Sequence, residues 1–365
     1  MQVLVTGGTG FIGTYLCEEL ADRGNDVTAL ARNPEEADVV ADVETVRGDV
    51  TDPGSLMAPF EGQDAVVNLV ALSPLFKPSG GDERHFEVHL RGTENCLEAA
   101  EANEVDRFVQ MSALGADPDG PTSYIQAKGE AEEVVKTAPL DWVVFRPSVV
   151  FGDGGEFVPF TRKLAPPYMT PLPGGGKSRF QPIWVGDIVS MLADAVEGTT
   201  TGPHADVGEE AEGTTDGAAT REPDEQGSES DETEGSEDAE ATDAVGETAD
   251  ASVAASESDA ADDPHVGRTY EIGGPEVLTL ADVAELAWAA EGKPVSVVPV
   301  PMALARVGLT VLDAIPGAPM GGDQYRSLQF DNTTGRNAVE AFGYREADLR
   351  TLADYLGVDE AEIRR

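Results

Sequence analysis

Short apolar runs alternate with amphipathic stretches over the first 146 residues of this 365-residue chain. The amphipathic stretches repeat their apolar positions every three to four residues, as helices do, whereas the runs between them have the length and the Val and Leu content of buried strands. The runs lie at residues 2–6, 26–31, 43–47, 64–68, 106–112 and 140–146. This alternation predicts an α/β fold with a doubly wound parallel sheet, whose ligand crevice lies at the carboxyl ends of the strands.

The pattern changes after residue 150, where segments rich in proline and glycine break up the chain. Helical periodicity returns near residues 279–292, 302–314 and 346–356, which predicts a smaller, helix-rich C-terminal lobe. The stretch 302–314 is apolar on more than one face. This is typical of a buried helix, and the alternative is a contact with a lipid-like substrate or a membrane-bound partner.

An acidic stretch separates these two parts of the chain. The net charge is −45, and between residues 197 and 263 there are 23 acidic residues and a single basic one, Arg221. Such a composition, which also lacks aromatic residues, buries too little apolar surface to offset the entropy of ordering. We therefore predict a disordered insertion at 197–267, between a domain at 1–196 and the rest of the fold at 268–365. The alternative is an interaction segment for a basic partner.

The first predicted strand runs into a turn and a helix that carry glycines at positions 7, 10 and 13. Gly7 permits a tight turn, Gly10 lets the backbone approach a pyrophosphate, and Gly13 lets the helix pack closely on the strand. The free N–H groups at the start of that helix favour an anion. The segment predicts a dinucleotide site of the Rossmann type, formed by Thr6, Gly7, Gly10, Phe11, Ile12 and Gly13.

A second motif follows the strand predicted at 106–112. Tyr124 and Lys128 are four residues apart, which places them on one face of a helix, one turn from each other. An ammonium group near a phenol stabilises the phenolate, so we expect the pKa of Tyr124 to lie below its usual value of about 10. Tyr124 could then exchange a proton with a substrate. The alternative is a surface tyrosine beside a solvated lysine.

With these two motifs in this order, the chain resembles the extended short-chain dehydrogenase/reductase superfamily. The resemblance covers residues 1–195 and resumes near residue 268. It implies that Lys128 also holds the nicotinamide ribose. It further implies cofactor contacts at the ends of the third, fourth and sixth predicted strands, made by Asp49, Val50, Val70, Ala71, Pro147 and Ser148.

Two positions depart from the pattern of that superfamily. Members usually end the fifth strand with a Ser-Ser pair whose second residue polarises the substrate carbonyl, and here Ser112 takes the first place and Ala113 the second. An asparagine ahead of the central helix is replaced by His89. The resemblance implies catalysis by Tyr124, Lys128 and Ser112 with an incomplete set of donors. Among the members of that superfamily, the chain most resembles atypical ones, such as the nucleotide-binding accessory subunit of respiratory complex I and its prokaryotic relatives.

Two functions remain open at this point. In the first, the protein is an oxidoreductase or epimerase that moves a hydride between a nicotinamide and a small-molecule substrate, while Tyr124 exchanges the proton. In the second, it is a non-catalytic nucleotide-binding subunit or sensor of an assembly of the respiratory-complex type. The first requires a second donor to the substrate oxygen, for which Thr122 and Ser123 are candidates.

The end of the second predicted strand indicates which dinucleotide is bound. The chain offers Arg32 there and has no carboxylate between residues 29 and 34. An arginine suits the 2′-phosphate of NADP, whereas NAD binders generally place an acidic residue at this point. We therefore predict NADP, with NAD as the alternative if Arg32 is solvated.

Charge and cysteine content indicate which partners and which cellular compartment to expect for the protein. A net charge of −45 disfavours nucleic acid as a partner and is typical of proteins from a high-salt cytoplasm, where screening weakens self-repulsion. Two isolated cysteines indicate a reducing compartment, and the four histidines lack metal-ligand spacing. The chain begins in a core strand and has no long apolar run, so we expect neither a cleavable signal nor a spanning helix. We predict a cytoplasmic protein and leave open a homodimer and a peripheral contact with a membrane or a respiratory complex.

Overall fold

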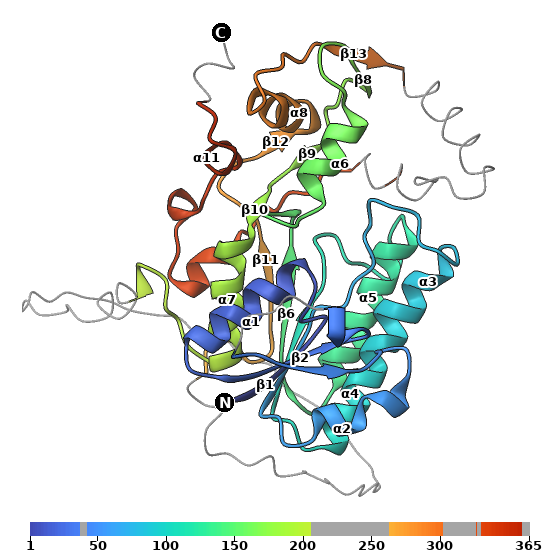
Figure 1. The fold of residues 1–365 in the computed structure, drawn as a ribbon, viewed down its shortest axis with the longest axis vertical. Helices are drawn as coiled ribbons and strands as arrows, with labels where there is room; N and C mark the ends of the chain where they lie inside the picture. The colour runs from blue at the N-terminus through green and yellow to red at the C-terminus, as the bar shows by residue number, and fades with distance from the viewer. Residues whose placement is uncertain (37–41, 206–262, 302–325, 327–329, 360–365) are drawn as a thin grey trace, which may run out of the picture. The chain divides into compact units, whose positions relative to one another are not determined.

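The computed structural model describes residues 1–36, 42–205, 263–301, 326 and 330–359. Its centre is a seven-stranded sheet in which neighbouring strands run parallel, in the order β11-β6-β5-β4-β1-β2-β3 (Figure 1). The strands are β1 (Gln2–Thr6), β2 (Asp26–Ala31), β3 (Glu44–Arg47), β4 (Ala65–Asn68), β5 (Arg107–Met111), β6 (Asp141–Pro147) and β11 (Arg268–Ile272). The order reverses at β1, which opens a crevice at the carboxyl ends of β1 and its neighbours. The predicted doubly wound parallel sheet is confirmed.

Successive residues of the central strands face opposite layers of helices. Val3 and Val5 of β1 pack in one core with α1 and α7, whereas Leu4 packs in a second core with α4 and α5. Figure 1 shows these two pairs of helices on opposite sides of the sheet. The helices are α1 (Phe11–Asp22), α4 (Gly92–Ala102), α5 (Ser123–Thr137) and α7 (Val185–Glu197). Burial on both faces explains why the strands read as continuous apolar runs.

A third core holds together the smaller lobe, which consists of short helices and two-stranded sheets. Its elements are β7 (Val150–Phe151), α6 (Phe157–Leu164), β8 (Thr170–Pro173), β9 (Arg179–Phe180), β10 (Ile183–Trp184), β12 (Leu278–Thr279), α8 (Leu280–Ala289), β13 (Val297–Val300) and α11 (Leu352–Leu356). The remaining short helices are η1 (Pro34–Glu36), η2 (Pro53–Ser55), α2 (Met57–Phe60), α3 (Glu83–His85), the π-helix η3 (Phe86–Arg91), η6 (Ala338–Phe342) and η7 (Glu346–Asp348). The helix predicted near 279–292 is confirmed as α8. The one predicted at 302–314 lies outside the described residues.

The helix predicted at 346–356 is wrong in its first half. Only a single 3-10 turn forms there, η7, and α11 begins further on. Between them Leu349 is extended and buried, and the backbone N–H of Arg350 donates to Asp187 of α7 at 2.9 Å. A continuous helix would have kept that N–H for its own carbonyls, so a long-range hydrogen bond overrides the local periodicity.

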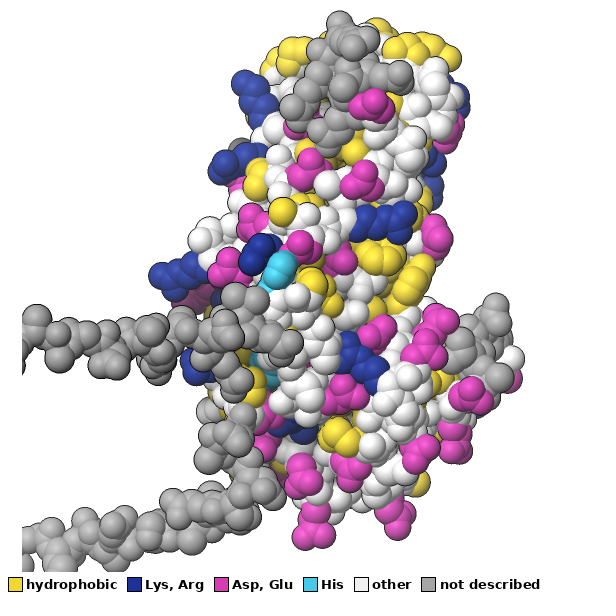
Figure 2. Space-filling model, turned by 90° about the vertical axis from the view of Figure 1, so that its left-hand side faces the viewer, with side chains coloured by type: hydrophobic (Ala, Val, Ile, Leu, Met, Phe, Trp, Pro, Cys, Tyr) yellow, Lys and Arg dark blue, Asp and Glu magenta, His cyan; other side chains and the backbone are white. Residues whose placement is uncertain are grey.

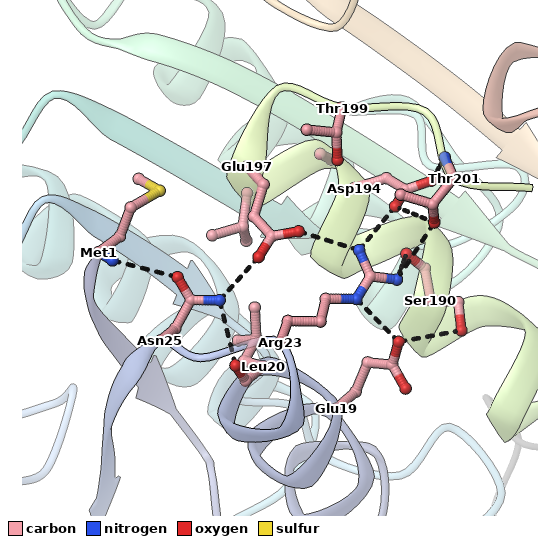
Figure 3. A network of polar contacts seen from close by, with 12 residues as sticks. Met1, Glu19, Leu20, Arg23, Asn25, Ser190, Asp194, Glu197, Thr199 and Thr201 are labelled. Carbon is pink, nitrogen blue, oxygen red and sulfur yellow. Dashed lines mark hydrogen bonds and ion pairs between the residues drawn. The ribbon is translucent and has the colours of Figure 1, made fainter. Parts of the chain in front are cut away.

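Arg23, which follows α1 directly, joins that helix to α7 (Figure 3). Its guanidinium contacts Asp194 at 2.7 Å, Glu197 at 3.0 Å and Glu19 at 2.8 Å. The Asp194 side chain is fully buried and also accepts hydrogen bonds from the Thr201 N–H and hydroxyl, at 2.9 and 2.7 Å. Because α1 begins at the glycine turn, this network also holds in place the helix that carries the predicted dinucleotide site.

The residues on both sides of the acidic stretch pack against the sheet. Arg107 at the start of β5 donates to the Ala195 carbonyl at 2.9 Å and forms an ion pair with Asp263. The ring of His265 hydrogen-bonds to the Thr199 carbonyl at 2.8 Å. Both ends of the predicted insertion therefore meet beside β5 and α7.

Charged side chains are dispersed over the surface shown in Figure 2, with Asp and Glu interspersed among Lys and Arg. Among the described residues, no helix has the length and apolar character needed to cross a membrane, and no group of His, Cys, Asp and Glu could hold a metal ion. Cys17 and Cys96 are buried and unpaired, and burial raises the pKa of both thiols to about 12. These thiols are therefore protonated members of the core.

Candidate functional site

A cavity of about 380 Å³ lies at the carboxyl ends of β1 to β4, beside the start of α1. The predicted cofactor residues that line it are Gly7, Gly10, Phe11, Ile12, Gly13, Arg32, Asp49, Val50, Val70 and Ala71. Its lining also includes residues that sequence reasoning missed, among them Thr9, Thr51, Leu72, Arg84 and Val88. The cavity thus joins four loops that are distant in sequence but end at one edge of the sheet.

The three predicted glycines have three different roles. Gly7 has a φ of +73°, a left-handed conformation that other residues rarely adopt. A Cβ on Gly13 would lie 2.2 Å from the Gly7 carbonyl oxygen, so only glycine lets α1 pack this closely on the turn. A Cβ on Gly10 would meet a single described atom within 4 Å, the same oxygen at 3.1 Å, so Gly10 instead keeps the cavity entrance open.

The start of α1 fits the pyrophosphate of a dinucleotide. Its N-cap has no side-chain hydrogen bond, and its first turn carries no acidic residue. The first N–H groups of a helix have no partner within the helix, and together with the helix dipole they attract an anion. The cradle and the unblocked helix end therefore suit a phosphate-bearing ligand.

Substitutions at Gly10 and Gly13 are expected to separate ligand binding from folding. Gly10→Val fills the pyrophosphate approach, so it should weaken NADPH binding, read by nicotinamide fluorescence, and leave the urea midpoint close to that of the wild type. Gly13→Ala should instead lower the free energy of unfolding by about 1–3 kcal/mol, because its Cβ meets backbone that must shift. Unchanged NADPH affinity in Gly10→Val would place the dinucleotide elsewhere.

Two arginines and one carboxylate bring charged side chains to the lining of the cavity. Arg32 and Arg84 both line the cavity, and Arg84 also pairs with Glu87. Burial would raise the pKa of the Asp49 carboxyl, but hydrogen bonds from Thr51 and the charges of both arginines lower it below its usual value. Arg84 lies in the short helix α3, which follows β4, and its charge was the only sequence signal for it.

The other predicted cofactor residues do not line the cavity: Thr6, Lys128, Pro147 and Ser148. Thr6 is fully buried, and its hydroxyl donates to the side-chain oxygen of Asn68 at 2.6 Å, which ties β1 to β4. The Ser148 hydroxyl donates to the side-chain oxygen of Asn332 at 2.7 Å. It thereby connects the end of β6 to the smaller lobe.

Tyr124 and Lys128 share one face of α5, but their protonation differs from the sequence-based expectation. Lys128 is buried, and its Nζ donates to the Met111 carbonyl at the end of β5, at 2.7 Å. Burial lowers the pKa of Lys128 to about 8 and raises the pKa of Tyr124 to about 12. The predicted lowering of the Tyr124 pKa is wrong for the protein by itself, because burial outweighs the lysine charge. Tyr124 is a neutral phenol at pH 7.

The hydroxyl of Ser112 is engaged by a buried carboxylate. Its Oγ donates to Glu132 at 2.5 Å, and Glu132 also accepts from Arg146 at 2.7 Å and from Lys136 at 2.8 Å. Burial opposes ionisation of Glu132, yet these donors hold its pKa below the usual value. The Ser112 hydroxyl therefore donates its single hydrogen to Glu132. Thr122 likewise caps α5 by accepting the Ile125 N–H at 3.3 Å.

Two histidines to which sequence reasoning gave no role pack against Tyr124. The rings of His85 and His89 are parallel, with centroids 5.6 Å apart, and both meet the Tyr124 ring nearly at right angles, at 5.7 and 5.3 Å. His89 lies in the π-helix η3, a rare form that is frequent at functional sites. The spacing of the two histidines, four residues along a helical segment, is the signal that could have found them.

Comparison with known proteins agrees with this site. Residues 7–162 match the family described as NAD(P)H-binding, and this stretch includes the glycine cradle, Tyr124 and Lys128. Over those residues the chain is similar to the NAD(P)H-binding family. The expected superfamily and a nicotinamide dinucleotide as cofactor are confirmed. The choice between NAD and NADP is taken up below.

The chain is similar to both a respiratory subunit and an enzyme. It is 27% identical over 214 residues, 56% of this chain and 52% of the relative, to the mitochondrial NADH dehydrogenase [ubiquinone] 1 alpha subcomplex subunit 9 of Arabidopsis thaliana. It is 31% identical over 177 residues, 43% of this chain and 53% of the relative, to the 2-alkyl-3-oxoalkanoate reductase of Stenotrophomonas maltophilia. The chain spans about half the length of these curated relatives.

The fold of this chain matches a solved structure over nearly its whole length. The UDP-glucose 4-epimerase of Thermus thermophilus in complex with NAD superposes with a TM-score of 0.54 at 20% identity, covering 94% of this chain and 99% of that one. At this identity the match shows a shared fold. Activity and substrate must therefore be argued from the site of this chain.

Proposed function

We propose that this protein is an NADPH-dependent carbonyl reductase in which Tyr124 is the proton donor. The observation that carries the proposal is the neutral Tyr124 phenol, whose pKa burial raises to about 12, on one helix face with buried Lys128. A neutral phenol carries the proton that a carbonyl oxygen must receive as it gains negative charge during reduction. A bound reduced dinucleotide would supply the hydride, and Lys128 would supply positive charge near the developing anion.

The preference for NADPH is supported by the charges around the cavity. Arg32 and Arg84 bring two positive charges to the lining where Asp49 brings one negative charge. Arginine holds a phosphate through several N–H groups at once, whereas a ribose hydroxyl gains little from a second cation. We expect both arginines to contact the 2′-phosphate.

Titration of NADPH and NADH into the purified protein, by nicotinamide fluorescence in molar salt, tests this preference. Arg32→Ser should raise the Kd for NADPH about 10- to 100-fold, the worth of a charge-assisted hydrogen bond, and change the Kd for NADH only a few-fold. Arg47→Ser is the matched control, because Arg47 lies outside the cavity lining and pairs with Glu35 on the surface. Equal losses for both dinucleotides would contradict the role of Arg32.

The reductase itself is tested by adding carbonyl compounds and quinones to the protein–NADPH complex. Oxidation of the bound NADPH would support a reductase. Tight binding without oxidation would favour the second function, a nucleotide-binding subunit of a larger assembly, in contact with a membrane or a respiratory complex. The similarity to the Arabidopsis subunit and the engagement of Ser112 by Glu132 support that alternative. A homodimer remains a prediction that sedimentation would test.

A further inference from the structure

The proposed reduction needs a second hydrogen-bond donor to the substrate oxygen. Ala113 has no polar side chain, and the Ser112 hydroxyl donates to Glu132. A carbonyl oxygen that gains charge is best stabilised by preorganised donors already aimed at it. We infer that His89 is that donor, and that its Nδ1–H and the Tyr124 hydroxyl bind the same carbonyl oxygen. This inference rests on the proposed reductase function.

The hydrogen bond to Leu72 decides which nitrogen of His89 carries the hydrogen. The Leu72 backbone N–H donates to His89 Nε2 at 3.4 Å, so that nitrogen presents a lone pair. Burial, together with the charges of Lys128 and His85, lowers the pKa of His89 well below its usual value, so the ring stays neutral. A neutral imidazole with a lone pair on Nε2 carries its hydrogen on Nδ1. His89 is therefore an N–H donor that gives up no proton.

That donor has no partner of its own. His89 is 2% exposed, and its Nδ1 is buried without a hydrogen bond among the described residues. An unpaired buried donor costs about 1–3 kcal/mol, and such groups are uncommon in folded proteins. A ligand oxygen at this nitrogen would remove that cost, which is what a substrate-binding donor requires.

His89 also connects the dinucleotide cavity with Tyr124. Leu72, which donates to its ring, and Val88, which precedes it, both line the cavity. On its other side the ring of His89 lies 5.3 Å from that of Tyr124, between centroids. An oxygen held by Tyr124 is then within reach of a group on the neighbouring ring.

The reaction balances with His89 unchanged. The hydride of NADPH forms the new C–H bond, the π electrons of the carbonyl move to its oxygen, and that oxygen takes the proton of Tyr124. A proton from the solvent then restores the Tyr124 phenol, so one carbonyl, one NADPH and one proton give one alcohol and one NADP+. His89 holds the oxygen while its charge develops and keeps its own proton throughout.

Three variants of the full chain test this assignment, with the carbonyl compound that the wild type reduces fastest as the probe. His89→Leu removes the donor and should lower kcat about 10²–10³-fold while the Kd for NADPH changes only a few-fold. His89→Gln restores an N–H donor and should recover most of that loss. His85→Leu removes the neighbouring ring, which also packs on Tyr124, and should lower kcat far less than His89→Leu. Equal effects of the two leucine variants would mean that the histidines only support the tyrosine ring, and would overturn the assignment.

A second measurement is independent of turnover. In ¹⁵N NMR spectra of the histidine-labelled protein with NADP+, His89, assigned from the His89→Gln spectrum, should be neutral with its hydrogen on Nδ1 at pH 7. A hydrogen on Nε2, or a protonated ring, would overturn the inference. If the wild type oxidises no NADPH with any carbonyl, the reductase fails and this role fails with it. Turnover that His89→Leu leaves intact would refute the role of His89 alone.

Discussion

Tyr124→Phe is expected to lower the rate of carbonyl reduction about 10²–10⁴-fold, the range contributed by a positioned general acid. In the proposed reduction the phenol gives the proton, and burial keeps it protonated by raising its pKa to about 12. Phenylalanine keeps the ring that packs against His85 and His89 but has no hydroxyl. The Kd for NADPH should therefore stay within a few-fold of the wild-type value. Single-turnover oxidation of bound NADPH measures the loss.

Tyr168→Phe is the matched control for that substitution, because Tyr168 is 64% exposed and lies outside the cavity lining. It should leave both the rate and the affinity unchanged. Full turnover in Tyr124→Phe would remove the tyrosine from the mechanism. A large loss of NADPH binding together with turnover would instead show that Tyr124 supports the dinucleotide site.

Arg23→Met is expected to lower the free energy of unfolding by about 3–5 kcal/mol, because it leaves a buried carboxylate without its cation. The Asp194 side chain is fully buried, and Arg23 is its ion-pair partner at 2.7 Å (Figure 3). Methionine retains much of the aliphatic stem of arginine, so the loss reports on charge more than on packing. Urea unfolding at a fixed molar salt concentration measures it.

A second substitution separates the buried charge from the shape of the site. Asp194→Asn removes the charge but keeps a side-chain oxygen for the Thr201 N–H, so the double variant with Arg23→Met should recover part of the lost stability. Arg47→Met breaks an exposed pair, with side chains 66% and 63% exposed, and should cost less than about 1 kcal/mol. Equal losses in Arg23→Met and Arg47→Met would contradict the importance of the buried pair.

The sheet and the dinucleotide cradle could be predicted because each depends on a pattern of neighbouring residues, apolar runs for the strands and spaced glycines for the cradle. The runs predicted at 2–6 and 26–31 have the same bounds as β1 and β2. A strand buried on both faces is apolar along most of its length, so its ends can be recognised in the sequence. The role of the glycines at the start of α1 could be predicted from the sequence. Gly7 has a left-handed backbone that other residues rarely adopt, and at Gly13 a side chain would collide with the backbone of the turn. The prediction of a helix at 346–356 was wrong in part because the Arg350 N–H donates to Asp187, a residue far away in the sequence.

Tertiary contacts decided the protonation and hydrogen bonding of the proposed donors. The sequence placed Tyr124 and Lys128 on one helix face but could not show that burial raises the pKa of one and lowers that of the other. It nominated Ser112 without indicating that Glu132, on the following helix, would engage its hydroxyl. Desolvation and hydrogen-bond partners depend on which distant segments pack together, so they cannot be read from spacing.

By itself, then, the sequence determined the parallel sheet through its alternation of apolar runs and amphipathic stretches. It determined the glycine cradle and the tyrosine–lysine face through steric limits and periodicity within single elements. Only the tertiary structure decided that Arg84 joins Arg32 at the cavity and that His89 meets Tyr124. The charge and hydrogen-bonding state of a side chain depend on the neighbours that folding brings to it, and those neighbours come from strands and helices far apart along the chain.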